Sequence, residues 1–312
     1  MYSVLSYEDL EIILTNFQTG GLINFQKLQG GSANTNYRVK TQNGSYILTV
    51  CESKSIEESR VLAKVLEHLE RNNFITSRII RTRTNELYCT WNSKPVLLKS
   101  YLEGKIMEDI PNFYFISLGL QLSHLHTIPV PDYIPLRLPY GHHRFNELKN
   151  YEPGASFYRW LSKIEIEIRK TIKSKDVKWS LIHGDVFHNN VIISESEKEA
   201  VIMDFEECCY YPRIFDLGMF IIGTCCPDYK PDLDKIEVFL NNYNKNLPLS
   251  NLEIKLLSLF SAYAAASTAF WRYTQFNINH PTEHLKNSYR KMQDLANIMS
   301  GFQSKFDQIL SA

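Results

Sequence analysis

Three polar side chains in the segment LIHGDVFHNNVIISESEKEAVIMDFE, residues 181–206, have the types and the spacing that phosphoryl transfer requires. This reaction needs an acceptor hydroxyl in line with the transferred phosphoryl group, and divalent cations that neutralise its charge. Asp185 can accept the proton of such a hydroxyl. Asn190 and Asp204 carry hard oxygen ligands, which Mg²⁺ prefers. The segment therefore predicts a phosphoryl-transfer site.

The surrounding residues predict how these side chains meet. The runs SLIH and NVIIS are apolar and flank a polar loop, and VIMDF follows the polar turn SESEKEA. Apolar runs of this length between polar turns predict strands. A hairpin of the second and third strands would bring Asp204 back beside Asn190. HGD alone is a weak motif, and carboxylates at strand ends are often ordinary surface groups, but the joint spacing favours a site.

Protein kinases have the same spacing, because their catalytic loop H-R-D-x-x-x-x-N precedes a metal-binding D-F-G. Here Gly184 stands in place of the Arg, and Glu206 in place of the Gly. A protein kinase also needs a long activation segment that ends in A-P-E. This chain has no A-P-E there, and FDLG at 215–218 begins only eleven residues after Asp204. The short interval predicts a small-molecule acceptor.

The motifs HGDxxxxN, DFE and FDLG are together similar to the signature of the aminoglycoside phosphotransferase and choline kinase superfamily. Residues 30–50, GGSANTNYRVKTQNGSYILTV, resemble the nucleotide loop and strands of the type II homoserine kinases within it. The resemblance implies an α+β, two-lobed, protein-kinase-like fold. Residues 1–103 would form a nucleotide-binding N-lobe of antiparallel sheet plus helix, and 104–312 a mainly helical catalytic and acceptor-binding C-lobe. ATP and Mg²⁺ are the implied cofactors.

The resemblance also implies roles for individual residues. Asp185 would be the catalytic base, Asn190 and Asp204 would hold magnesium, and Asp216 would support the catalytic loop. We expect His183 to bond the loop backbone rather than to carry a proton, because Asp185 already fills that role.

On the nucleotide side, Gly30, Gly31 and Ser32 lie between two strand-like segments. Glycines allow the backbone to approach phosphates closely, although a Gly-Gly pair alone usually indicates only a turn. The segment Ser100, Tyr101, Leu102 is expected to form the interlobe linker, whose backbone groups would bind the adenine edge.

Many kinases place a nucleotide-binding Lys on the strand at 45–52, paired with a Glu on the next helix. In this chain the two positions are Thr49 and Leu62, so the pair is absent as a whole. The type II homoserine kinases resemble this chain in having Thr in that strand. Lys54 is an alternative source of charge, or an ordinary solvated Lys.

The acceptor candidates follow from the chemistry of homoserine, a zwitterion with a primary hydroxyl. Glu206 and Glu207 are candidates to bind its ammonium group, and Arg213 its carboxylate, with a structural salt bridge as the alternative for Arg213. Tyr210, Tyr211, Trp271 and Tyr273 would instead suit a cationic acceptor such as choline, or simply form core.

Composition limits the remaining classes. The chain has 312 residues, 44% hydrophobic and 22% charged, with zero formal net charge, so we expect neither nucleic acid nor a membrane as partner. MYSVLSYEDLEIIL has no secretory pattern, which favours a cytoplasmic protein with its six cysteines as buried free thiols. The sequence leaves the oligomeric state open.

The leading hypothesis is an ATP-dependent kinase that phosphorylates L-homoserine in threonine biosynthesis. A choline, ethanolamine or other amino-alcohol kinase is the first alternative, and an aminoglycoside phosphotransferase the second, although zero net charge gives no support for a polycationic acceptor. A non-catalytic nucleotide-binding protein is supported only by the missing Lys–Glu pair.

Overall fold

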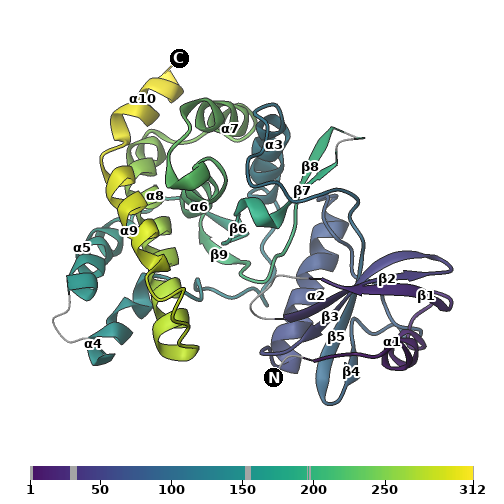
Figure 1. The fold of residues 1–312 in the computed structure, drawn as a ribbon. Helices are drawn as coiled ribbons and strands as arrows, with labels where there is room; N and C mark the ends of the chain where they lie inside the picture. Colours follow the sequence, from purple (N-terminus) through teal and green to yellow (C-terminus); the bar gives the residue numbers. More distant parts are fainter. Residues whose placement is uncertain (1–2, 29–33, 152–155, 195, 197, 312) are drawn as a thin grey trace. The chain divides into compact units, whose positions relative to one another are not determined.

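The computed structural model describes residues 3–311 except 29–33, 152–155, 195 and 197. The predicted glycine loop at 30–32 lies outside the described residues. The chain divides into two compact units, residues 1–104 and 105–312, which we describe separately (Figure 1). The boundary lies one residue after the one expected from the sequence, and the roles assigned to the two units stay predictions.

The first unit is an antiparallel sheet with two helices. The sheet has the order β1-β2-β3-β5-β4. Its β2–β3 hairpin pairs Thr41 with Gly44, as the Asn43-Gly44 turn predicted. The bounds are α1 (Tyr7–Leu14), β1 (Leu22–Lys27), β2 (Asn34–Thr41), β3 (Gly44–Cys51), α2 (Ile56–Arg71), β4 (Cys89–Trp91) and β5 (Lys94–Ser100).

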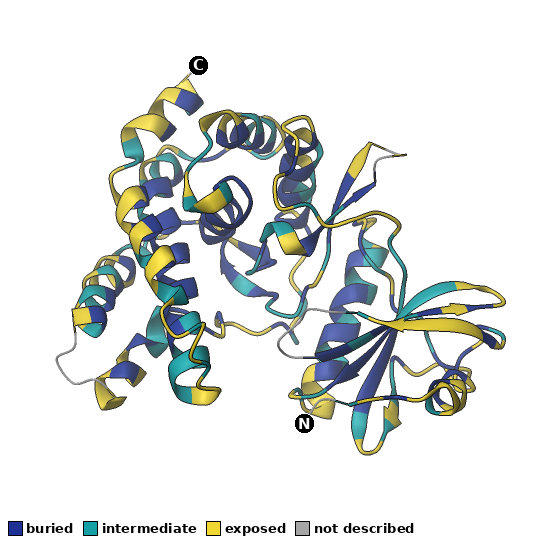
Figure 2. Cartoon of the chain, viewed as in Figure 1, coloured by how far each residue is buried: buried dark blue, intermediate teal, exposed yellow. Residues whose placement is uncertain are grey.

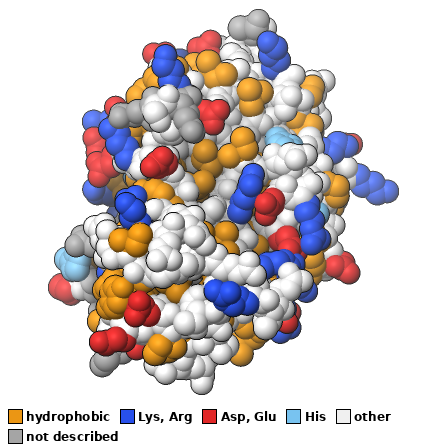
Figure 3. Space-filling model, turned by 90° about the vertical axis from the view of Figure 1, so that its right-hand side faces the viewer, with side chains coloured by type: hydrophobic (Ala, Val, Ile, Leu, Met, Phe, Trp, Pro, Cys, Tyr) orange, Lys and Arg blue, Asp and Glu red, His pale blue; other side chains and the backbone are white. Residues whose placement is uncertain are grey.

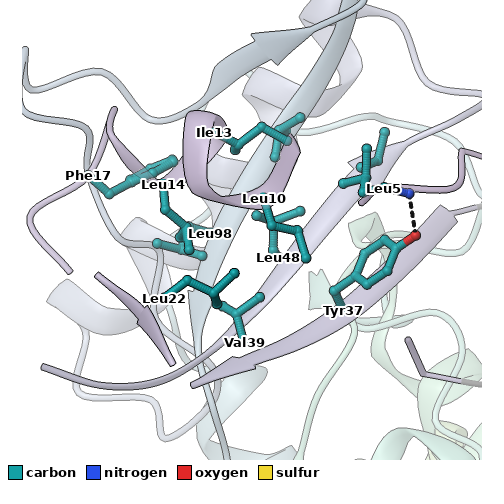
Figure 4. Close-up of a cluster of buried hydrophobic side chains, with 12 residues drawn as sticks. Leu5, Leu10, Ile13, Leu14, Phe17, Leu22, Tyr37, Val39, Leu48 and Leu98 are labelled. Carbon is teal, nitrogen blue, oxygen red and sulfur yellow. Dashed lines mark hydrogen bonds between the residues drawn. The ribbon is translucent and has the colours of Figure 1, made fainter. Parts of the chain in front are cut away.

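Helix α1 covers one face of this sheet. Ser6 caps the helix and exchanges hydrogen bonds with Asp9, as the sequence predicts for a helix start. Leu10, Ile13 and Leu14 of this helix point into a buried cluster with strand residues such as Val39 and Leu48 (Figure 4). Tyr37 lies in the same cluster, and its hydroxyl accepts a hydrogen bond from the Leu5 N–H at 2.8 Å.

The second unit is mainly helical. Its helices are α3 (Tyr114–Leu125), α4 (Leu148–Tyr151), α5 (Ser156–Thr171), α6 (Arg213–Thr224), α7 (Leu233–Asn246), α8 (Asn251–Thr274), α9 (Ser288–Ser300) and α10 (Gln303–Ser311). Short helices with tighter or wider turns are η1 (His142–Glu147), η2 (His188–Asn190), η3 (Pro227–Tyr229) and η4 (Gln275–Asn279). Two small sheets pair β6 (Trp179–Ile182) with β9 (Cys209–Pro212), and β7 (Val191–Ser194) with β8 (Glu199–Ile202).

Helix α6 is buried along its whole length (Figure 2). Its sequence RIFDLGMFIIGT has apolar residues on every side, which is the pattern of a helix enclosed by other elements. Gly218 allows α8 to approach closely, because a Cβ at this position would lie 2.7 Å from the Phe260 carbonyl oxygen. This run therefore forms a helix in the core of the second unit.

The six cysteines are free, as the sequence predicted; five are buried as expected, whereas Cys89 is only half-buried. No helix in the described part of the chain is long and apolar enough to cross a membrane. On the face shown in Figure 3, Lys and Arg side chains alternate with Asp and Glu side chains, in keeping with the zero net charge.

Candidate active site

The loop 183–190 connects β6 to β7 and carries the predicted catalytic motif. The β7–β8 hairpin pairs Val191 with Ile202, so the residues that flank these positions also meet. The Met203 N–H donates to the Asn190 carbonyl at 2.9 Å. The hairpin therefore places Asp204 next to the end of the loop, as the sequence predicted.

His183 connects the two ends of this segment through its ring. Its Nε2 donates to the Met203 carbonyl at 2.9 Å, and its Nδ1 accepts the Asp185 N–H at 3.1 Å. One nitrogen donates and the other accepts, so these bonds require the neutral imidazole. Burial lowers the pKa of His183, which favours the same form. The ring thus has the structural position expected for it.

Asp216, in α6, holds the start of the loop through backbone hydrogen bonds. Its carboxylate accepts the His183 N–H at 2.8 Å and the Gly184 N–H at 2.9 Å. His126 Nε2 lies 3.1 Å from the same carboxylate, and His126 Nδ1 lies 2.7 Å from the Tyr243 hydroxyl. Burial acts to raise the pKa of Asp216, but the His126 hydrogen bond and charge outweigh it, so the pKa is lowered.

Gly184 takes a backbone conformation that side chains rarely adopt. Its φ is +87°, and an added Cβ would lie 2.8 Å from the Glu207 carbonyl oxygen. The Tyr140 hydroxyl donates to the Gly184 carbonyl. Glycine in place of the kinase Arg is therefore required by the close approach of the loop to residue 207.

Asp185, the predicted catalytic base, is held by Asn190 and lies close to Asp204. The Asn190 side-chain amide donates to its backbone oxygen at 2.7 Å and to its carboxylate at 3.1 Å. Burial first, and then the charge of Asp204, raise the pKa of Asp185 to about 6. Asp204 itself is exposed and has a φ of +70°. Such outliers cluster at functional sites.

The donor set fits a magnesium ion. Two carboxylates lie close enough for one to raise the pKa of the other, and a cation between them would relieve this repulsion. The Asn190 Nδ2 is used by Asp185, which leaves Oδ1 as a ligand atom. Among the described residues no group of three or more His, Cys, Asp or Glu side chains is placed to hold a metal. Mg²⁺ usually takes only one or two protein carboxylates besides phosphate oxygens and water.

The acceptor candidates differ in their surroundings. Glu206 and Glu207 are half-buried directly after the buried Phe205. Arg213 is buried, and its guanidinium forms two 2.7 Å bonds to Glu253 and one of 2.8 Å to the Pro248 carbonyl. Its donors are used within the fold, so the geometry favours the salt bridge that was the alternative for Arg213.

The predicted nucleotide residues of the first unit lie on β3 and at the end of β5. Thr49 is fully buried and donates to the Asn36 side chain at 2.7 Å. Ser100 accepts the Arg78 N–H at 2.8 Å, and Arg38 lies 4.1 Å from the centre of the Tyr101 ring. Leu62 is buried where a Glu partner would stand, so no ion pair forms at these two positions. Leu102 follows β5 in an irregular segment, and the nucleotide roles of these residues stay predictions.

His126 and Tyr140 were not predicted as site residues. They contact Asp216 and Gly184 from positions 90 and 44 residues away in sequence. No local pattern marks either residue, because their contacts depend on the tertiary fold.

The sequence profile of the phosphotransferase enzyme family matches residues 24–236, more than half of the chain. The chain belongs to this phosphotransferase family. A homoserine kinase from Methylobacillus flagellatus is 24% identical to the phosphotransferase over 257 residues, 81% of this chain and 80% of that enzyme. One from Rhodopseudomonas palustris is 25% identical over 273 residues, 85% of this chain and 83% of the relative.

Solved structures with the same fold are also phosphotransferases. The match to a spectinomycin phosphotransferase with ADP and spectinomycin covers 97% of this chain and 100% of that enzyme, with TM-score 0.73 and 14% identity. The match to an amicoumacin kinase with AMP-PNP and Ca²⁺ covers 93% of this chain and 92% of that kinase, with TM-score 0.74 and 15% identity. The match to a choline kinase from Streptococcus pneumoniae covers 93% of this chain and 98% of that kinase, with TM-score 0.70 and 14% identity.

The family match confirms the predicted superfamily, and the fold matches confirm the α+β protein-kinase-like fold. The phosphotransferase is a small-molecule kinase. Its individual site residues and its acceptor stay predictions.

Proposed function

We propose that this kinase transfers the γ-phosphate of ATP to the side-chain hydroxyl of L-homoserine, a step in threonine biosynthesis. The observation that carries the proposal is the similarity, over four fifths of the chain, to relatives named homoserine kinase. The relatives bound to ADP, or to AMP-PNP with Ca²⁺, support a nucleotide and a divalent metal as cofactors.

In the proposed reaction, Asp185 accepts the proton of the acceptor hydroxyl. The oxygen of this hydroxyl forms a bond to the γ-phosphorus, and the bond from the γ-phosphorus to ADP breaks, so that ADP leaves. A general base works best with a pKa near the operating pH, and burial with the Asp204 charge raises the pKa of Asp185 to about 6. Asn190 and Asp204 would hold Mg²⁺, which neutralises charge on the transferred phosphoryl group. Asp216 and His183 keep the loop in position.

The test is ADP release with Mg-ATP and one acceptor at a time: L-homoserine, hydroxylysine, choline, ethanolamine and kanamycin. We expect stimulation by homoserine. Asp185→Asn should lower kcat by about 10²- to 10⁴-fold, the usual contribution of a general base, while Mg-ATP still binds. Asp176→Asn, at an exposed carboxylate, is the matched control. Homoserine without effect on ADP release would refute the proposed substrate.

An amino-alcohol kinase is the second candidate, because an ethanolamine kinase and a choline kinase share the fold. Trp271 and Phe276 form an edge-to-face pair and are half-buried, as side chains at a cation site could be. Stimulation by choline or ethanolamine alone would favour this function over homoserine phosphorylation.

A further inference from the structure

Arg272, near the end of α8, lies beside Tyr229 in η3. Its Nη1 donates to the Tyr229 hydroxyl at 3.1 Å and to the Ser288 carbonyl at 3.3 Å. The Tyr229 ring also has two cations over it, because Arg272 Cζ lies 5.6 Å and Lys291 Nζ 5.1 Å from its centre. Tyr229 thus joins two positively charged side chains from α8 and α9.

The positive charge of Arg272 has no carboxylate partner among the residues that the structure describes. A guanidinium has five N–H donors, and the described bonds use only Nη1. The edge formed by Nε and Nη2 remains, and this planar pair of donors matches the two oxygens of a carboxylate. Asp228 precedes Tyr229, but it is exposed and forms no ion pair with Arg272.

The arginine lies near the catalytic loop. Thr224, the last residue of α6, donates to the Val186 carbonyl at 3.0 Å, and His188 Nδ1 lies 3.3 Å from the Gly223 carbonyl. η3 begins three residues after α6 ends, so Tyr229 follows this contact with the loop by only five residues. The charge of Arg272 also acts to lower the pKa of Asp185. Asp228 and Tyr229 have φ of +49° and +62°, an uncommon conformation for residues other than glycine.

We propose that Arg272 binds the carboxylate of the acceptor through its Nε–Nη2 edge, and that Lys291 adds positive charge to this subsite. The inference rests on the proposed function, because it concerns the acceptor of the same site. It assigns the acceptor to the hydroxy amino acids and excludes amino alcohols as preferred substrates. It also moves the carboxylate-binding role from Arg213 to Arg272.

The experiment compares L-homoserine with 2-amino-1,4-butanediol, which has a hydroxymethyl group in place of the carboxylate. Arg272→Gln should raise KM for homoserine by about 10- to 100-fold, the range for a lost hydrogen bond to a charged group. KM for the diol and for ATP should change less than about twofold. Arg272→Lys keeps the charge but loses the planar edge, so we expect an intermediate KM.

Two controls separate binding from structure. Arg290→Gln removes an exposed cation on α9 that lies over Tyr289, and it should leave the preference for homoserine over the diol unchanged. Tyr229→Phe removes the hydroxyl partner of Arg272 but keeps the guanidinium, so it should also retain most of the preference.

The outcomes separate the two proposals. If homoserine is phosphorylated and Arg272→Gln leaves its KM unchanged, the subsite is wrong and the proposed function stands. If hydroxylysine is the acceptor and its KM depends on Arg272, the subsite stands and homoserine is wrong. If the enzyme phosphorylates no acceptor that carries a carboxylate, the proposed subsite is wrong.

Discussion

At Gly184, both the backbone conformation and a close neighbouring atom disfavour any side chain. Its positive φ strains any other residue, and the Glu207 carbonyl occupies the place of a Cβ. We therefore expect Gly184→Ala to lower the free energy of unfolding by more than about 1 kcal/mol and to lower kcat as the loop shifts. Chemical denaturation and ADP release measure the two effects.

Gly301→Ala is the matched control for this substitution. Gly301 ends α9 with a φ of −97°, and a Cβ there would meet no atom closer than 3.7 Å. This variant should keep wild-type stability within about 0.5 kcal/mol. Equal effects at the two glycines would contradict the role given to the Glu207 carbonyl.

His126 supports the loop indirectly, through Asp216. His126→Phe removes one hydrogen bond to a buried carboxylate, which typically costs about 1.5–3 kcal/mol. We expect a loss of stability in this range, together with a lower kcat and a nearly unchanged KM for ATP. His124→Phe, two residues earlier in the same helix, should have a much smaller effect. Equal losses at the two histidines would argue against support through Asp216.

For single residues, the sequence predicts contacts between residues that are close in the chain. Asp185, Asn190 and Asp204 could be found because the loop and hairpin fix their spacing, and the hairpin register brings them together. Tyr140 and His126 could not be found, because each contacts the loop or Asp216 from a distant element. The contact of Arg272 with Tyr229 likewise joins distant elements. Arg213 was a candidate to bind the acceptor carboxylate, with a structural salt bridge as the alternative; its partner Glu253 lies 40 residues away, and no local pattern identifies that partner.

Between elements, the Arg213–Glu253 pair joins the first turn of α6 to the first turn of α8. Removing one partner of a buried ion pair typically costs about 3–5 kcal/mol, because the other charge stays buried. Arg213→Met should therefore lower the unfolding free energy by about this amount, with the acceptor KM unchanged at a temperature where the variant is folded.

The double variant Arg213→Met with Glu253→Leu tests this interpretation. It removes both charges, so its loss of stability should be smaller than that of Arg213→Met alone. An increase in acceptor KM in either variant, with normal stability, would instead restore Arg213 as a substrate-binding residue.

The helices and strands themselves were largely predictable. Ser6 with Asp9, and Ser55 with Glu58, form reciprocal caps that the sequence indicates. The run ELYCTW at 86–91 has a strand-like sequence, but the strand is shorter, Cys89–Trp91, because only these residues pair with β5. Capping and turn chemistry act over four residues and can be recognised locally, whereas strand length depends on the partner strand.

For the molecule as a whole, Glu52 makes the stability of the first unit depend on pH. In the first unit, Glu52 accepts hydrogen bonds from Lys94 at 2.5 Å and from Thr35 at 2.6 Å. Burial acts to raise the pKa of Glu52, but these bonds outweigh it and lower the pKa to about 2. A carboxylate with a lowered pKa stabilises the fold above its unfolded value, near 4.5, and loses this effect as the pH falls towards 2.

Glu52→Gln should therefore destabilise the first unit at pH 7, and the difference from wild type should shrink as the pH falls from 4.5 towards 2. Trp91, the only tryptophan before residue 105, reports urea unfolding of this unit when the other three are changed to Phe. The exposed Glu57→Gln is the control. A difference that stays constant with pH would show that the charge of Glu52 is not the cause.

The native cysteines can be used to measure how often each unit opens. Burial raises the pKa of Cys89 to about 11 and that of Cys226 to about 12, so these thiols are protonated in the native state. Cys51 and Cys89 belong to the first unit, and the other four thiols to the second. The rates at which a thiol reagent modifies the two sets in native buffer therefore time the opening of each unit separately, without any introduced probe.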